Sequence, residues 1–178
     1  MLDFKYKVIF FVLLILSFVI LLSGKAWHDQ KSFRDYRASL LFPTYIDKTI
    51  PDIDIIDVNG EKISREDLLS GRSILHFWAT WCKSCEQELY SISRLKRDGL
   101  KVYCISIDES KSDAIEYLKT RGIDIPLYFD VDHKTANRLG SYKFPETYLI
   151  KNGRIVLKFE GPRDWDNKTL LDFIMEEL

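Results

Sequence analysis

A short apolar run that leads directly into a pair of cysteines constrains the fold more than any other feature of this chain. Residues Ser73 to Ala79 are SILHFWA, an apolar and aromatic stretch bounded upstream by Gly71. A run of this length and composition predicts a central, buried β-strand. Residues 83–95 then have apolar side chains at helical spacing, so Cys82 and Cys85 fall where a strand ends and a helix begins.

The rest of the chain predicts an alternation of strands and helices. The expected strands are residues 54–58 and 61–63, joined as a hairpin by Asn59-Gly60, then 100–108, 127–129, 147–151 and 155–160, with a second hairpin turn at Asn152-Gly153. The expected further helices are residues 112–122, 132–140 and 164–178. Crossover helices between the early strands and a hairpin late in the chain predict an α/β fold with a mixed sheet and helices on both faces.

An apolar segment near the N-terminus predicts a membrane interaction. Residues Val8 to Leu22 are VIFFVLLILSFVILL, a run shorter than the roughly 20 residues that span a bilayer unless tilt and flanking residues make up the difference. A cleavable signal peptide is the alternative, although Ser23, Gly24 and Ala26 form an imperfect cleavage site. We predict an uncleaved transmembrane anchor at residues 1–24, a polar stalk at 25–48 and one soluble domain at 49–178.

The charge balance and the number of cysteines exclude other classes of protein. Lys and Arg number 26 against 27 Asp and Glu, so no large positive field would attract nucleic acid, and we expect no nucleic-acid partner. Three cysteines are too few for the disulfide framework of a small secreted scaffold. The close spacing of Cys82 and Cys85 therefore indicates chemistry rather than cross-linking.

The position of Cys82 and Cys85 predicts thiol-disulfide exchange. A thiol at a helix N-terminus faces unpaired backbone N–H groups and the positive end of the helix dipole, which lower a cysteine pKa from about 8.5. Cys82 is thus the expected attacking sulfur, open to solvent, and Cys85, one turn later and pointing inward, would release a mixed disulfide. Lys83 and Ser84 between them would tune the reduction potential. Two thiols complete the cycle, so we expect no cofactor and no resident metal.

Such a pair of cysteines has three alternative uses. Half of a zinc site is one, but zinc needs four ligands, and Cys104, His28, His76 and His133 form no second paired motif. A Cu(I)-binding module that uses the two soft thiolates is a second. A thiol peroxidase is a third, and it would require a threonine three residues before its reactive cysteine, where this chain has Ala79.

Two longer segments make the comparison with known proteins specific. FWATWCKSC at residues 77–85 and FPETYLIKNGRIV at 144–156 resemble the TlpA, ResA and CcmG (DsbE) group of membrane-anchored extracytoplasmic proteins, with a likeness that spans about residues 49–178. The resemblance implies a thioredoxin fold with an N-terminal β-hairpin extension. The Pro-Glu-Thr triplet at residues 145–147 is most similar to the cytochrome c maturation branch.

The same resemblance implies a function and a location. It implies a single-pass protein of the cytoplasmic membrane, with its thioredoxin domain on the extracytoplasmic, periplasmic side. There it would reduce disulfides in exported proteins, such as those of apocytochrome c or of copper sites. A thiol-disulfide electron donor in the membrane would then return the pair to its dithiol form.

The resemblance also assigns roles to single residues. The proline before the late strand is cis in that group and its neighbouring backbone pairs with the substrate chain, which implies these properties for Pro145, with Phe144 immediately before it. An acidic residue three positions after the second cysteine is Glu88, which would accept the proton of Cys85. The alternative interpretation of Glu88 is a solvated acid early in a helix, where the dipole favours it.

One residue departs from the pattern of that group. His76 occupies the strand position where thioredoxins have a buried Asp and this group usually has an apolar or amide side chain. It would either exchange protons near neutral pH or be a hydrogen-bonded core histidine. Among its neighbours we expect Cys104 to be a buried apolar filler, Trp78 to lie in the core, and Trp81 to shape the substrate surface beside Cys82.

Overall fold

The computed structural model describes residue 17 and residues 43–95 and 99–178. The predicted anchor and most of the predicted stalk therefore lie outside the described residues. Within the part that is described, no helix has both the length and the apolar character needed to cross a bilayer. All of the fold described below belongs to one compact unit, Leu40–Leu178.

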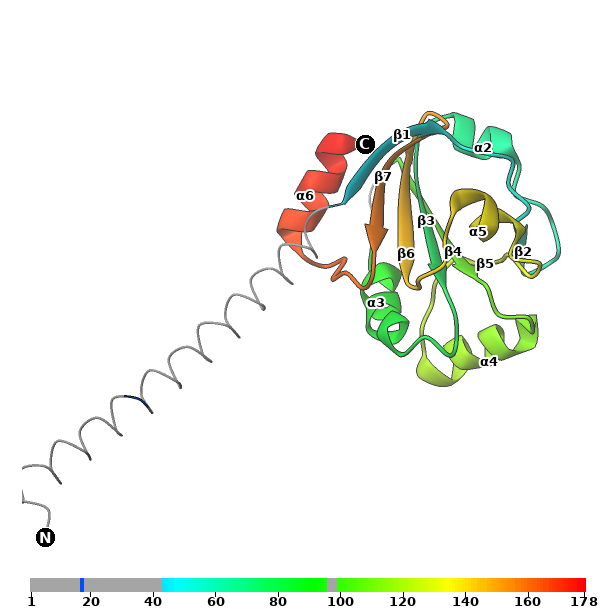
Figure 1. The fold of residues 1–178 in the computed structure, drawn as a ribbon. Helices are drawn as coiled ribbons and strands as arrows, with labels where there is room; N and C mark the ends of the chain where they lie inside the picture. The colour runs from blue at the N-terminus through cyan, green and yellow to red at the C-terminus, as the bar shows by residue number, and fades with distance from the viewer. Residues whose placement is uncertain (1–16, 18–42, 96–98) are drawn as a thin grey trace, which may run out of the picture. The chain divides into compact units, whose positions relative to one another are not determined.

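A seven-stranded mixed sheet forms the centre of this unit, with the strand order β1-β7-β6-β3-β4-β5-β2 (Figure 1). The strands are β1 (Thr44–Thr49), β2 (Ile56–Asp57), β3 (Arg72–Trp78), β4 (Leu100–Ser106), β5 (Leu127–Phe129), β6 (Glu146–Lys151) and β7 (Arg154–Glu160). Strand β3 is parallel to β4 and antiparallel to β6, and all of its residues except Arg72 are buried. The predicted central strand and the mixed sheet are confirmed.

Five helices pack around the sheet in the described residues: α2 (Arg65–Leu69), α3 (Lys83–Ser93), α4 (Lys111–Arg121), α5 (Lys134–Leu139) and α6 (Lys168–Glu177). Successive side chains of a strand point to opposite faces. On β6, the Thr147 hydroxyl forms a hydrogen bond with the ring of His76 of β3, and this ring lies beside Glu88 of α3. The hydroxyl of the next residue, Tyr148, donates instead to the backbone carbonyl of Leu139 at the end of α5. Helices α3 and α5 therefore cover opposite faces, as Figure 1 shows.

The predicted hairpin at residues 54–63 is present, but it is shorter than predicted and has a different turn. Ile56 and Asp57 form a strand that also pairs with β5, and the second arm meets it at the bridge between Ile56 and Lys62. Beside this bridge the Asp57 N–H donates to the Glu61 carbonyl at 2.8 Å and the Ile63 N–H to the Ile55 carbonyl at 3.0 Å. Of the two predicted turn residues only Gly60 has a positive φ, 88°, and the Asp57 carboxylate accepts from the N–H groups of Asn59 and Glu61, each at 2.8 Å, so the turn is not the expected two-residue one.

The sheet begins earlier than predicted, because residues assigned to the stalk form β1. This strand pairs antiparallel with β7 through Thr44 to Thr49, although the stalk was expected to extend to residue 48. Five of its six residues are exposed, so it has no alternation of apolar and polar side chains that would indicate a strand. Helix α2 was also missed, although Ser64 and Asp67 form a capping box at its start.

The second predicted hairpin is confirmed. Asn152 and Gly153 between β6 and β7 have φ angles of 49° and 74°, the left-handed values that a tight hairpin turn requires. Helix α4 runs from Lys111 to Arg121, close to the predicted residues 112–122, with Ser110 as its N-cap and Gly122 as its C-cap. Helix α6 begins at Lys168 rather than near residue 164, because Asn167 is the residue whose side chain caps it.

Candidate functional site

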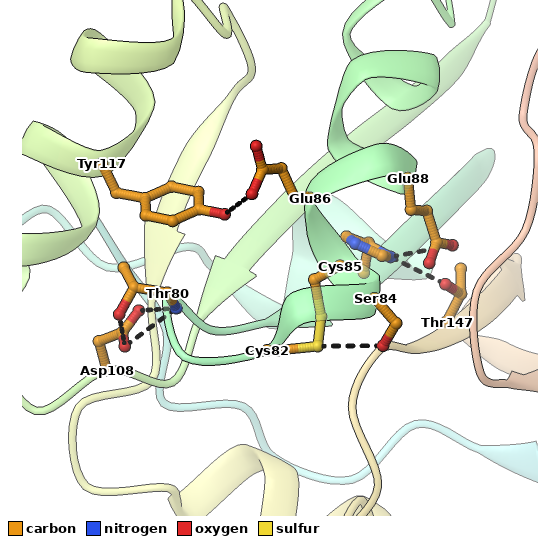
Figure 2. Close-up of a disulfide and its surroundings, with 10 residues drawn as sticks. Thr80, Cys82, Ser84, Cys85, Glu86, Glu88, Asp108, Tyr117 and Thr147 are labelled. Atoms are coloured by element: carbon orange, nitrogen blue, oxygen red, sulfur yellow. Dashed lines mark hydrogen bonds and ion pairs between the residues drawn. A yellow bond between two sulfur atoms is a disulfide. The ribbon is translucent and has the colours of Figure 1, made fainter.

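A disulfide joins Cys82 and Cys85 at the start of α3, directly after the central strand β3 (Figure 2). Cys82 is the N-cap residue of the helix, and its side chain makes no capping hydrogen bond. The N–H groups of the first helical turn and the positive end of the helix dipole therefore act on this sulfur, which favours a thiolate there in the reduced protein. This is the strand-to-helix junction that the sequence predicts.

A network of hydrogen bonds holds the loop between β3 and α3 in place. The N–H of Cys82 donates to the carbonyl of Ala79 at 3.1 Å. The Asp108 carboxylate accepts from the Thr80 N–H at 3.0 and 3.1 Å and from the Thr80 hydroxyl at 2.8 Å. The Ser106 hydroxyl donates to the same carboxylate at 2.9 Å. Asp108, which sequence reasoning missed, thus fixes the turn two residues before the first cysteine.

The two sulfurs differ in burial, but less than the sequence suggested. Cys82 exposes only 6% of its surface and Cys85 1%. The expectation that Cys82 is open to solvent is therefore wrong for the disulfide form, in which its sulfur is bonded to Cys85 and lies 3.6 Å from the Ser84 hydroxyl. Lys83, Ser84 and Trp81 around it are exposed.

The loop before β6 lies beside the disulfide loop. The Phe144–Pro145 peptide bond is cis, as the resemblance implies. The rings of Trp81 and Phe144 pack edge to face with their centroids 6.0 Å apart, so the two loops are in contact. Trp81 is 67% exposed, and Tyr142, which sequence reasoning missed, is 72% exposed. The sequence has no pattern that distinguishes Tyr142 from any other aromatic residue in a loop.

Glu88 lies on the buried side of α3, one turn after Cys85. Only 1% of its surface is exposed, so the interpretation of Glu88 as a solvated acid is wrong. Its Oε1 accepts a hydrogen bond from the indole N–H of Trp165, and its Oε2 has no partner among the described residues. Burial raises the pKa of Glu88 to about 8, although the Trp165 hydrogen bond, the charge of Arg163 and a hydrogen bond from the Arg163 backbone oppose the shift.

His76 is fully buried in the centre of the sheet, behind the disulfide. Its Nδ1 lies 2.9 Å from the Thr147 hydroxyl and 3.8 Å from Oε1 of Glu88. Its Nε2 has no partner among the described residues. Burial lowers the pKa of His76 to about 3, so neutral imidazole is favoured. Figure 2 shows Glu88 and Thr147 close together, with dashed lines that lead from each to the same ring.

The remaining predicted residues have structural positions. Cys104 is a fully buried free thiol, and burial raises its pKa, which fits the expected apolar filler. Trp78 lies in the core, as expected. Glu146, directly after Pro145, is buried and pairs with the Lys158 ammonium at 3.1 Å.

Trp165 lies before α6, although the sequence predicts a helix from residue 164. It is fully buried, and its indole reaches Glu88 across 77 positions of sequence. Its backbone N–H also donates to the hydroxyl of Ser91, at 3.1 Å. Trp165 therefore belongs to the surroundings of the site, and no local pattern in the sequence indicates this contact.

Comparison with known proteins identifies this arrangement. A family model described as the AhpC/TSA family matches residues 46–158, more than half of the chain. The chain belongs to the AhpC/TSA family. Within this thioredoxin-fold family its relatives are named for thiol-disulfide exchange. The thiol-disulfide oxidoreductase ResA of Bacillus thuringiensis (strain Al Hakam) is 30% identical over 121 residues, which cover 65% of this chain and 70% of ResA.

A second relative and a solved structure extend the likeness. The thiol:disulfide interchange protein DsbE of Tatumella citrea is 28% identical over 162 residues, which cover 89% of this chain and 86% of DsbE. The crystal structure of StoA from Bacillus subtilis has a TM-score of 0.60 at 20% identity, covering 72% of this chain and 99% of StoA, which shows the fold. The protein is thus a thiol-disulfide oxidoreductase of the ResA and DsbE type, with Cys82 and Cys85 as its disulfide-forming pair.

Proposed function

We propose that this oxidoreductase works as a membrane-tethered reductase of disulfides in exported proteins. The observation that supports this direction best is the burial of the second sulfur, since Cys85 exposes only 1% of its surface. A buried sulfur is a poor place for a thiolate, so the dithiol form gains no stabilisation from Cys85. A pair whose reduced form is not specially stabilised transfers its electrons readily, unlike a strongly oxidising pair.

The exposed side chains around the disulfide favour a polypeptide substrate. Trp81 and Tyr142 are exposed aromatic residues, Phe144 packs against Trp81, and cis-Pro145 follows at once. Aromatic side chains provide large contact areas at low entropic cost. An extended segment with a cysteine pair, such as the haem-binding site of an apocytochrome c or a copper site, fits this surface, and Pro145 is the position where its backbone would pair.

The location is part of the proposal. The apolar run Val8 to Leu22 would anchor the protein in the cytoplasmic membrane, with the thioredoxin domain on the extracytoplasmic side. Tethering raises the effective concentration of the domain near a thiol-disulfide donor in the same membrane. That donor would return the pair to the dithiol form after each cycle.

The substrate can be identified by trapping it as a mixed disulfide. In the full-length Cys85→Ser variant, Cys82 attacks a substrate but no second sulfur resolves the complex. Mixed disulfides should therefore accumulate and be released by reductant, and mass spectrometry should identify exported proteins with cysteine pairs. Cys104→Ser is the matched control, because it removes a buried thiol outside the pair and should trap nothing. Trapped cytoplasmic proteins alone, or no mixed disulfides at all, would contradict the proposal.

The redox state in cells tests the direction separately. Alkylation of thiols in intact cells, followed by separation by mass, should find Cys82 and Cys85 mostly as a dithiol. A pair that is mostly a disulfide would indicate an oxidant. A reporter enzyme that works only outside the cytoplasm should be active when it is fused after Leu178. Activity of a reporter that works only inside the cytoplasm, fused at the same place, would overturn the proposed location.

A further inference from the structure

Two titratable groups lie side by side in the closed interior behind the disulfide. The side chains of His76 and Glu88 are both fully buried, and Nδ1 of the imidazole is 3.8 Å from Oε1 of the carboxyl group. Each group also has one polar atom without a partner among the described residues, Nε2 of His76 and Oε2 of Glu88. Buried polar atoms are normally satisfied, so a pair left in this state requires an explanation.

The groups around the pair come from every element packed against it. Thr147 of β6 contacts the imidazole, and Trp165, in the loop before α6, donates to the carboxyl group. From the same loop Arg163 acts on Glu88 with a positive charge. From β4, Cys104 is the register neighbour of His76, and on α3 Cys85 precedes Glu88 by one turn.

We propose that His76 is a positioning residue for disulfide exchange. His76 and Glu88 form a buried pair that shares one proton. After the pair has lost this proton, it accepts the proton of the Cys85 thiol. In the one-proton state the carboxyl group is neutral beside a neutral imidazole, or a carboxylate lies beside an imidazolium. Both arrangements have no net charge, so both are tolerated in a buried site. This inference rests on the exchange activity and not on the proposed direction or substrate.

The step balances as follows for the reduced enzyme. The Cys82 thiolate attacks a substrate disulfide, the substrate S–S bond breaks, and the released substrate thiolate takes a proton from water. Cys85 then passes its proton to the emptied pair, and its sulfur attacks Cys82. The enzyme S–S bond forms, the mixed disulfide breaks, and the second substrate sulfur leaves as a thiolate. The enzyme is oxidised by two electrons and the substrate is reduced by two.

A hollow on the flank of α3 offers the pair a route to solvent. Its volume is about 390 Å³, and Glu88 forms part of its wall together with Gln87, Ser91, Arg94, Pro162, Arg163 and Asp164. None of these residues belongs to the disulfide loop or to the loop of Pro145. In this proposal the hollow is the side on which the pair would exchange its proton with water while a bound substrate covers the disulfide.

The pH dependence of the resolving step tests the role of His76. Charge attraction from an ionised Glu88 at 3.8 Å opposes the burial that keeps His76 neutral, which gives the proton a second, less occupied place to reside. Asparagine offers no such place, so His76→Asn should lose the last proton at lower pH. Its midpoint for the release of a peptide from a preformed mixed disulfide should therefore fall.

Two further variants isolate the pair. Glu88→Gln should abolish the midpoint that the raised pKa of Glu88 gives the unmodified protein, and adding His76→Asn to Glu88→Gln should then change nothing further. Thr147→Val keeps the imidazole but removes its hydrogen bond, and should give a smaller change of midpoint. This variant decides the matter if His76→Asn does not fold.

An unchanged midpoint in His76→Asn and in Thr147→Val would overturn the proposal. An equal change of midpoint with and without Glu88 would also overturn it, because His76 would then act independently of the carboxyl group. Failure of peptide release in every protein, the unmodified one included, would instead contradict the exchange activity itself.

Discussion

Two buried carboxyl groups lie on opposite sides of the disulfide loop, and their surroundings differ in kind (Figure 2). Asp108 accepts hydrogen bonds from the N–H and hydroxyl groups of Thr80 and from the Ser106 hydroxyl. Glu88 accepts from the Trp165 indole and from the Arg163 backbone, and its Oε2 has no partner among the described residues. One carboxylate is satisfied by the protein, and the other is left short of partners.

The difference separates a structural role from a chemical one. A carboxylate held by several donors fixes the atoms around it. A buried carboxyl group with few donors resists ionisation, and its proton becomes available for chemistry near neutral pH. The comparison predicts that changes at Asp108 affect folding, whereas changes at Glu88 affect how the protein responds to pH.

The largest expected effect is the loss of a pH dependence in Glu88→Gln. Because the folded-state pKa of Glu88 is raised from 4.5 to about 8, its contribution to stability is complete below pH 4.5 and is lost as the pH rises through 8. The free energy of unfolding of the unmodified protein should fall by on the order of 4 kcal/mol over this range relative to Glu88→Gln. Denaturant unfolding of the oxidised full-length protein at several pH values measures this difference. If the free energy of unfolding depends on pH in the same way in the unmodified protein and in Glu88→Gln, the contrast between the two carboxyl groups is lost.

A smaller loss of stability is expected for Asp108→Ala at every pH. The substitution leaves the Thr80 N–H and two hydroxyl groups without their acceptor, which should cost about 3 kcal/mol. Chemical denaturation at pH 7 checks the value. Glu109→Ala, one residue further and exposed, is the matched control and should change stability by less than about 0.5 kcal/mol. Equal effects of the two substitutions would show that Asp108 does not hold the loop.

The smallest effect is expected for Thr80→Val, which separates the hydroxyl contact of Thr80 with Asp108 from its backbone contacts. The variant keeps the two backbone contacts of Thr80 with Asp108 and removes the hydroxyl at 2.8 Å. It should lower the free energy of unfolding by about 1 kcal/mol, the worth of one hydrogen bond. A loss as large as that of Asp108→Ala would show that the backbone contacts contribute nothing.

The sequence predicts much of the fold because the central elements have strong local patterns. Strand β3 is an uninterrupted apolar run, α3 has helical spacing, and Asn152-Gly153 specifies a tight turn. Strand β1 could not be predicted in this way, since its side chains are mostly exposed and only its pairing with β7 makes it a strand. At residues 54–63 the Asn-Gly signal correctly indicates a hairpin, but the hydrogen bonds from Asn59 and Glu61 to the Asp57 carboxylate hold a turn of another type than the expected one.

In the site, too, some features follow from the local sequence and others only from tertiary packing. The cysteine pair lies within one turn of helix, so its spacing alone indicates its use. The contacts of Glu88 with Trp165 and of Thr80 with Asp108 join residues 77 and 28 positions apart, and tertiary packing alone creates them. Helix position suggested a solvated Glu88, but the packing of Trp165 over α3 buries it.

The central claim is that exchange begins at Cys82 and that Cys85 resolves it. The most direct test is limited alkylation of the reduced, folded protein at pH 7, with mass spectrometry to locate each modified cysteine. Cys82, at the helix N-cap, should be modified first, while Cys85 and the buried Cys104 should react only after unfolding. Modification of Cys85 or Cys104 before Cys82, or of all three together only after unfolding, would contradict the account.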